Sequence, residues 1–218
     1  MSESSSLPSA RGAAVGRRIG IGLMQGLWKP RVLGGWRMPA TGPVILAVNH
    51  THNIDGPMLM GTCPRPVHFL IKKEAYVGPL GTFLRGIGQV EVDRTSADRN
   101  AITRALGVLQ NGGVLGIFPE GTRGEGDFAS LRSGLAYFAV RSGAPIVPVA
   151  VLGSTEARGR LISALPPLRS RVDLVYGDPF QAGDGSGRRT RAALDEATVR
   201  IQERLTDHLT AARRATGR

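Results

Sequence analysis

Cysteine and long apolar runs are almost absent from this sequence. Its 218 residues include one cysteine, Cys63, so the chain can form no internal disulfide, and we expect it in a reducing compartment. No apolar run approaches the roughly 20 residues of a membrane-spanning helix. Residues 1–6 lack the basic start and the apolar middle of a signal peptide. These absences predict a protein that is made and kept in the cytoplasm.

Acidic and aromatic residues are also scarce. Lysine and arginine number 28 against 17 aspartates and glutamates, which gives a net charge of +11 and predicts an anionic partner. Aromatic residues make up 5% of the chain, too few for a platform on which bases stack. The sequence also has no helix-turn-helix signature and no zinc-finger spacing. We therefore expect no nucleic-acid partner and favour an anionic membrane surface.

Two N-terminal segments precede the main domain, which we place at 35–218. Residues 1–10 are rich in serine and predict a disordered tail. Residues 11–34 predict a helix that lies in a membrane interface, because apolar residues recur four apart beside several arginines. These apolar residues are Val15, Ile19, Leu23 and Leu27. The glycines interspersed among them indicate, as an alternative, a helix packed on the domain through its small-residue face.

Beyond residue 43, short apolar runs alternate with helical patterns. The runs that predict strands are Val44–Val48, Val67–Ile71, Gln89–Val92, Val114–Phe118, Ile146–Val151 and Val172–Tyr176. The patterns that predict helices are Ser96–Gln110, Leu131–Arg141 and Thr190–Arg213, with Ser96 as the N-cap of the first. Strands separated by helices predict an α/β fold, with a single domain whose mixed, partly parallel sheet is flanked by helices.

A histidine and a carboxylate follow the first of these strands. His50 and Asp55 are five residues apart, which is not the spacing of neighbours on one helix face, so they can converge only across a loop. Such a loop could place the carboxylate on the imidazole, as a general base requires. Asp55 could instead cap a helix, and His50 could be an ordinary turn histidine. His52 is a second candidate base, and the spacing to Asp55 favours His50.

A second loop follows the strand that ends near Phe118. It contains Glu120, Gly121 and Arg123. Glycine lets a backbone approach a ligand closely, and the arginine fork matches phosphate oxygens. Glu120, directly after a buried strand, needs an arginine or ligand hydroxyls as partner. The alternative is a Pro-Gly turn with a surface ion pair.

Together these residues resemble the glycerolipid acyltransferase family, of the lysophosphatidate (1-acylglycerol-3-phosphate) acyltransferase type. The family's four blocks match Asn49–Asp55, Gly88–Arg94, Phe118–Arg123 and Pro145–Val149, in that order. The lysine that precedes the second block matches Lys72. The resemblance implies the α/β fold of the glycerol-phosphate acyltransferases and makes 35–218 the acyltransferase domain.

The resemblance also implies a mechanism. His50 would deprotonate an acceptor hydroxyl as it attacks the thioester of acyl-CoA or acyl-carrier protein, and Asp55 would orient the imidazole, without a covalent enzyme intermediate. Arg123, Arg94 and Lys72 would hold the acceptor's phosphate, and Glu120 and Gly121 would shape that pocket. The implied enzyme needs neither a cofactor nor a metal. It would work as a peripheral protein on the inner face of the cell membrane.

Two alternatives concern the substrate and the reaction class. The acceptor implied first is a lysophospholipid, lysophosphatidate giving phosphatidate, but related enzymes use other lipid or glycolipid acceptors. A metal-dependent hydrolase would account for the His50-Thr51-His52 pattern, yet it would need more ligands. The remaining histidines are His68, within a predicted strand, and His208, on the last predicted helix.

Overall fold

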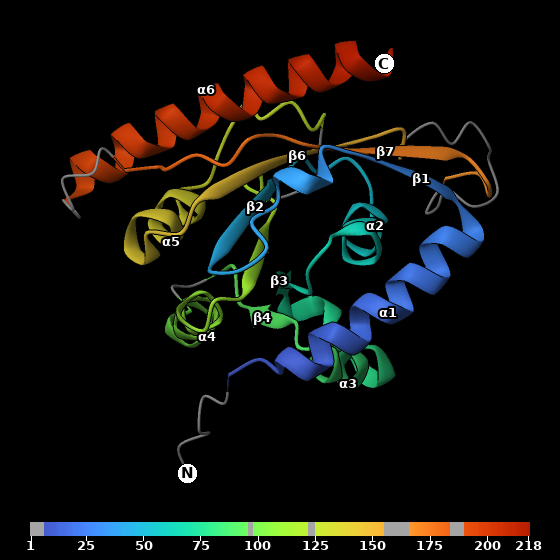
Figure 1. The fold of residues 1–218 in the computed structure, drawn as a ribbon. Coiled ribbons are helices and arrows are strands. Elements are labelled where there is room, and N and C mark those ends of the chain that lie inside the picture. Colours follow the sequence, from blue (N-terminus) through green and yellow to red (C-terminus); the bar gives the residue numbers. More distant parts are fainter. Residues whose placement is uncertain (1–6, 96–97, 122–124, 155–165, 184–189) are drawn as a thin grey trace.

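Seven strands rich in valine, isoleucine and leucine form one mixed sheet within residues 7–95, 98–121, 125–154, 166–183 and 190–218, which the computed structural model describes (Figure 1). Their order across the sheet is β1-β7-β6-β2-β5-β3-β4. Strands β6 and β7 pair antiparallel, and the other neighbours pair in parallel. The strands are β1 (Lys29–Leu33), β2 (Val44–Val48), β3 (Val67–Lys72), β4 (Val90–Val92), β5 (Val114–Ile117), β6 (Ile146–Leu152) and β7 (Arg171–Tyr176).

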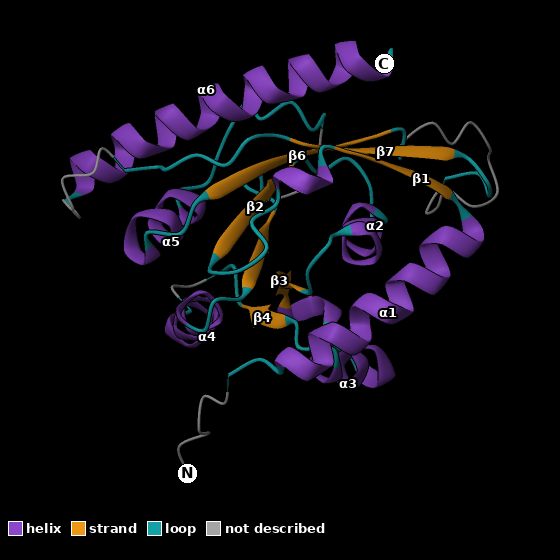
Figure 2. Ribbon diagram, in the orientation of Figure 1, coloured by secondary structure: helices purple, strands orange, loops and turns teal. Residues whose placement is uncertain are grey.

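Helices cover both faces of the sheet (Figure 2). They are α1 (Ala10–Leu27), α2 (Asp55–Thr62), α3 (Gly78–Gly86), α4 (Arg99–Gln110), α5 (Gly134–Ser142) and α6 (Arg191–Thr216). Successive residues of a strand point to opposite faces, so the sheet supports two cores. Ile45 and Ala47 of β2 pack with residues of α4, α5 and α6. Val44, Leu46 and Val48 pack with residues of α1 and α2. The predicted α/β fold with a mixed sheet is confirmed.

The strands and helices predicted beyond residue 43 are present, with ends that agree to within three residues. The helix predicted over 11–34 is too long, because α1 ends at Leu27 and β1 occupies Lys29–Leu33. The predicted N-cap Ser96 lies outside the described residues, and the helix begins later. Its N-cap is Asp98, whose carboxylate accepts the Ala101 N–H at 2.9 Å. The sequence analysis does not predict β1 or α3. Strand β1 carries Pro30 and two basic residues, which an edge strand tolerates, so its apolar pattern is weak.

Helix α1 packs on the domain through its glycines. A Cβ placed on Gly61 of α2 would lie 2.4 Å from the carbonyl oxygen of Gly20, so the two backbones touch. A Cβ on Gly12 would likewise lie 2.2 Å from the Gly86 carbonyl oxygen at the end of α3. These contacts confirm the alternative prediction that the helix packs on the domain through the face that carries its small residues. The apolar stripe lies outside this backbone contact, and its four residues are between 38% and 51% exposed. No helix in the described part of the chain combines the length and apolarity needed to cross a bilayer.

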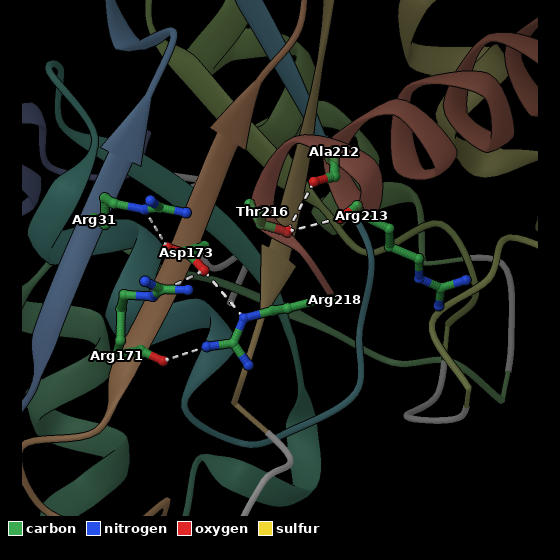
Figure 3. A network of polar contacts seen from close by, with 7 residues as sticks. All are labelled: Arg31, Arg171, Asp173, Ala212, Arg213, Thr216 and Arg218. Atoms are coloured by element: carbon green, nitrogen blue, oxygen red, sulfur yellow. Dashed lines mark hydrogen bonds and ion pairs between the residues drawn. The ribbon is translucent and has the colours of Figure 1, made fainter.

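A buried carboxylate connects the edge of the sheet to the last helix (Figure 3). Asp173 of β7 is fully buried, and its oxygens lie 2.6 Å from Nε of Arg31 in β1 and 3.0 Å from Nε of Arg218, which follows α6. Nε of Arg171 lies 3.4 Å away. One side chain thus holds together elements from distant parts of the sequence.

Candidate active site

Four parallel strands deliver the candidate residues to one edge of the sheet. Strands β2, β5, β3 and β4 are neighbours, so their carboxyl ends meet there. His50 follows β2, Lys72 ends β3, Arg94 follows β4, and Gly121 follows β5. All four line a cavity of about 710 Å³. The structure therefore brings together residues that the sequence places up to three strands apart.

His50 and Asp55 converge across the loop between β2 and α2. Nδ1 of His50 lies 3.1 Å from Oδ2 of Asp55, which is fully buried, while the histidine side chain is 20% exposed. The same oxygen accepts the backbone N–H groups of Thr51 at 2.9 Å and His52 at 2.7 Å. When Nδ1 carries the ring hydrogen and donates it in a hydrogen bond to the carboxylate, Nε2 is free to accept a proton from a substrate. The arrangement suits a general base oriented by a carboxylate.

The hydrogen bonds of Asp55 do not agree with the alternative hypothesis that it only caps a helix. The N-cap position of α2 is Ile54, and Asp55 is the first helical residue. Its carboxylate turns back to the preceding loop and fixes three of that loop's N–H groups, one from the imidazole and two from the backbone. Asp55 therefore orders the histidine loop itself.

His52 occupies a different environment from His50. Its Nδ1 lies 3.4 Å from the backbone nitrogen of Ile54, and the residue is not among those that line the cavity. His68 Nδ1 lies 2.6 Å from the Gly88 carbonyl oxygen, and His208 Nε2 lies 2.9 Å from that of Val175. Within the described ranges, no group of three or more histidine, cysteine or acidic side chains is placed to bind a metal. The two remaining histidines therefore each lie against a backbone carbonyl oxygen and add no ligand to the His50-Thr51-His52 loop.

Basic residues line the other side of the cavity. Lys72 is exposed there, and a guanidinium nitrogen of Arg94 donates to the carbonyl oxygen of Gly121. Lys73 points elsewhere, because its ammonium pairs with Asp93 at 2.6 Å. This hydrogen bond, together with those from Thr95, lowers the pKa of Asp93 to about 2. Thr122, Arg123 and Gly124 lie outside the described residues. Lys72 and Arg94 are therefore the described cations that face the space in front of His50.

Glu120 lies beside the cavity, not on its surface. The residue is half-buried, and this burial raises the pKa of its carboxyl group, with a smaller effect from the charge of Asp127. A hydrogen bond from the Phe128 backbone and the proximity of His50 partly offset the rise in pKa. These neighbours place Glu120 between the two loops that carry the candidate residues. Its predicted contribution to the phosphate pocket stays a prediction.

Apolar side chains make up most of the remaining cavity wall. They come from α1, α2 and α3 and include Ile19, Leu23, Met60, Leu80, Phe83 and Ile87. Leu23 and Phe83 are 51% and 44% exposed, so the apolar wall reaches the molecular surface. A hydrocarbon chain can lie along this wall with its reacting end at His50.

A family model described as Acyltransferase matches residues 29–152, more than half of the chain. The chain belongs to this family. The match includes all four strands that deliver the candidate residues, and it confirms the resemblance seen in the motifs. The protein is an acyltransferase.

Curated relatives and a solved structure agree with this identification. The acyltransferase is 27% identical over 170 residues to the 1-acyl-sn-glycerol-3-phosphate acyltransferase of Bacillus subtilis, across 77% of this chain and 82% of that protein. It is 31% identical over 129 residues to the enzyme of that name from Borreliella burgdorferi, across 57% of this chain and 52% of that one. The crystal structure of the 1-acyl-sn-glycerophosphate (LPA) acyltransferase PlsC from Thermotoga maritima has the same fold, with a TM-score of 0.69 at 24% identity over 91% of this chain and 80% of that one.

Two residues that the sequence analysis does not assign a role support the histidine of the acyltransferase. Asn49 is 1% exposed, and its amide group bonds to both backbone groups of Val151, donating to the oxygen at 3.1 Å and accepting from the nitrogen at 2.7 Å. Phe118 stacks on the ring of His50. A polar residue directly after a fully buried strand is the signal that points to Asn49, since a buried amide must find partners.

Proposed function

We propose that this acyltransferase acylates the free hydroxyl of lysophosphatidate and so makes phosphatidate in phospholipid biosynthesis. The donor is an acyl thioester of CoA or of acyl-carrier protein. The observation that carries the proposal is one apolar cavity lined both by His50, which pairs with a buried carboxylate, and by the cations Lys72 and Arg94. The names of the two curated relatives support the same acceptor.

The histidine acts as the general base. As the acceptor hydroxyl attacks the thioester carbonyl carbon, Nε2 of His50 takes its proton, and Asp55 stabilises the imidazolium that forms. The tetrahedral intermediate then collapses with cleavage of the carbon–sulfur bond, and the imidazolium returns the proton to the leaving thiolate. Because the acceptor's own hydroxyl is the nucleophile, no acyl group is bonded to the enzyme.

The cations position the acceptor. Lys72 and Arg94 face the cavity. In the sequence, Arg123 comes two residues after Gly121. A phosphate held by these side chains fixes the neighbouring hydroxyl near His50, and such positioning supplies a large share of catalysis. Glu120 and Gly121 shape the loop that approaches this phosphate.

A comparison of two acceptors tests the proposal. Thiol release from a long-chain acyl-CoA is measured with lysophosphatidate and with the corresponding monoacylglycerol. We expect wild type to prefer the phosphorylated acceptor strongly, and Arg123→Ala to lose most of that preference. Arg123→Lys keeps the charge without the fork and should chiefly raise the acceptor KM. Equal use of both acceptors by wild type would reject the phosphate clamp and favour a neutral lipid or glycolipid acceptor.

We further propose that the protein works as a peripheral protein on an anionic membrane, at the inner face of the cell membrane. The exposed stripe of α1 lies beside exposed residues of α3, Leu80 and Phe83, which are 51% and 44% exposed. Several of these side chains also line the cavity, so a lipid acceptor could enter from the bilayer. The net charge of +11 favours anionic headgroups.

Single substitutions test the membrane proposal without disturbing the fold. Deleting residues 1–28 would also remove Met24 and Trp28 from the core, so point variants are the cleaner choice. Leu23→Asp should reduce co-sedimentation with vesicles that contain anionic lipid. Val199→Asp, at a residue of α6 that is 57% exposed, is the matched control and should bind as wild type does. Unchanged binding of Leu23→Asp would reject the proposed surface.

A further inference from the structure

A second cavity of about 540 Å³ lies between α4 and α5, next to the first. The two cavities share four residues as walls, which are Leu70, Arg94, Phe118 and Gly121. Arg132 and Ser133, which precede α5, line the second cavity but not the first. Arg132 lies outside the four motif blocks.

Two guanidinium groups converge on one glycine at the boundary of the cavities. Arg94 donates to the Gly121 carbonyl oxygen from one side. A Cβ on Gly121 would lie 2.2 Å from Nε of Arg132, so the Arg132 side chain crosses directly over this residue. Gly121 has a φ of +74°, which a glycine adopts without strain. The pKa of Arg94 is lowered, first by burial and then by the positive charge of Arg132.

The carboxylates of the second cavity are occupied by other groups. Asp93 accepts from Lys73 and from Thr95. Asp98 accepts the backbone N–H groups of Asp93 and Ala101. Across the described ranges, neither Arg94 nor Arg132 makes an ion pair, although Glu74 is close enough to raise the pKa of Arg94 slightly. Among the described residues, the two positive charges therefore meet without a carboxylate paired to either of them.

The start of α5 adds to the positive potential. The helix has nine residues, and no side chain caps its N-terminus. Ser133, Gly134 and Leu135 all line the cavity. The first N–H groups of a helix carry partial positive charge, so they attract the same kind of ligand as the two guanidinium groups.

We propose that Arg132 and Arg94 form a phosphate-binding site over Gly121, on the α4–α5 side of the loop. Two forked guanidinium groups can each donate two N–H groups to one phosphate. The inference rests in part on the proposed function, because a phosphate here belongs to one of the two substrates. The phosphate comes either from the acceptor or from the carrier of the acyl thioester, and the shared chemistry is a phosphate group next to the reacting cavity.

Direct binding tests the site without turnover. The full-length protein is titrated by calorimetry with glycerol 3-phosphate and with CoA. Arg132→Ala should weaken binding of one of them by about tenfold to a hundredfold, the range for one lost charge-assisted contact. Arg132→Lys should give an intermediate loss of affinity, because lysine keeps the positive charge but lacks the forked guanidinium group. Arg141→Ala, at an exposed residue in the last turn of α5, is the matched control and should bind as wild type does.

The outcomes assign the source of the phosphate. A weakened response to glycerol 3-phosphate, with a raised KM for lysophosphatidate, identifies the acceptor. A weakened response to CoA, with a raised KM for acyl-CoA, identifies the donor. The proposal is overturned if wild type binds neither ligand, or if Arg132→Ala binds both as tightly as wild type does.

Failure of this site and failure of the proposed acceptor give different results. If wild type does not acylate lysophosphatidate but binds a phosphate ligand through Arg132, the acceptor is wrong and the site stands. If wild type acylates lysophosphatidate and Arg132→Ala changes neither binding nor KM, the site is wrong and the acceptor stands. Thermal unfolding of each variant checks that the fold is kept.

Discussion

The aromatic ring of Phe118 stacks on the imidazole of His50, with ring centroids 4.1 Å apart and planes inclined by 28°. The two residues follow neighbouring parallel strands, β5 and β2, so the contact joins the two motif loops. Phe69 of β3 stacks on Phe118 in turn, with centroids 5.8 Å apart. A row of rings from three adjacent strands therefore limits the motion of the imidazole and shields one side of it from water.

The first prediction separates the two histidines of the loop. His50→Ala should lower the rate of acyl transfer by roughly 10²–10⁴-fold, the usual contribution of a positioned general base. His52→Ala should keep most of the activity, because His52 does not line the cavity. The rate is measured as thiol release from acyl-CoA. Activity that survives in His50→Ala but disappears in His52→Ala would show that the assignment is wrong.

Asp55→Asn gives a companion measurement. The amide oxygen of asparagine can still accept the N–H groups of Thr51 and His52, so the loop should keep its shape. The negative charge that favours the imidazolium is lost, and turnover should fall. Wild-type turnover in a folded Asp55→Asn variant would contradict the proposed role of this carboxylate.

The second prediction concerns the contact between α1 and α2. Gly61→Ala should lower the free energy of unfolding by about 1–3 kcal/mol, because the new methyl group overlaps the Gly20 carbonyl oxygen. Gly22→Ala should instead raise it by about 0.5–1 kcal/mol, since Gly22 lies inside α1 with open space around it. Urea unfolding of the three proteins measures both changes. Equal effects of the two substitutions would mean that the helices do not pack this closely.

The third prediction concerns the amide of Asn49. Asn49→Ala leaves both backbone groups of Val151 buried without their partner, and the free energy of unfolding should fall by about 1–3 kcal/mol for each of them. The rate of acyl transfer should fall as well, because His50 is the next residue. Asn111→Ala removes one amide bond at the exposed end of α4, to the Gly107 carbonyl, and should change stability by about 1 kcal/mol at most. A large loss in both variants would show no special role for Asn49.

The fourth prediction concerns pH. Burial lowers the pKa of His68 below its ordinary value of 6.5, and burial also lowers the pKa of His208. Below about pH 6.5 the unfolded chain therefore binds more protons at these residues than the folded protein does, and the free energy of unfolding decreases as the pH falls. The stabilisation is fully present above this pH. Urea unfolding at pH 7 and pH 5 measures the slope, and His68→Asn should make it shallower. If the free energy of unfolding of His68→Asn depends on pH as strongly as that of wild type, His68 does not cause the pH dependence.

The sequence predicts what depends on local pattern. The buried runs such as Val114–Ile117 reveal the strands, and the loops at their ends reveal His50 and Asp55. What remained unpredicted depends on contacts between distant residues. The bond from Asn49 to Val151 spans 102 positions, and Arg132 matters only because the fold lays it across Gly121. Strand β1 is absent from the prediction because Pro30 and two basic residues leave it without an apolar run.

The network at Asp173 attaches two segments that are distant in the sequence to one buried carboxylate. If β1 detached alone, Arg31 would leave a buried carboxylate with less neutralising charge, and detachment of the end of α6 would do the same through Arg218. Opening of either segment therefore carries the cost of a poorly neutralised buried charge, and both segments should resist local opening. Amide hydrogens of β1 and of the last turn of α6 should exchange more slowly than is usual for an edge strand and a helix end.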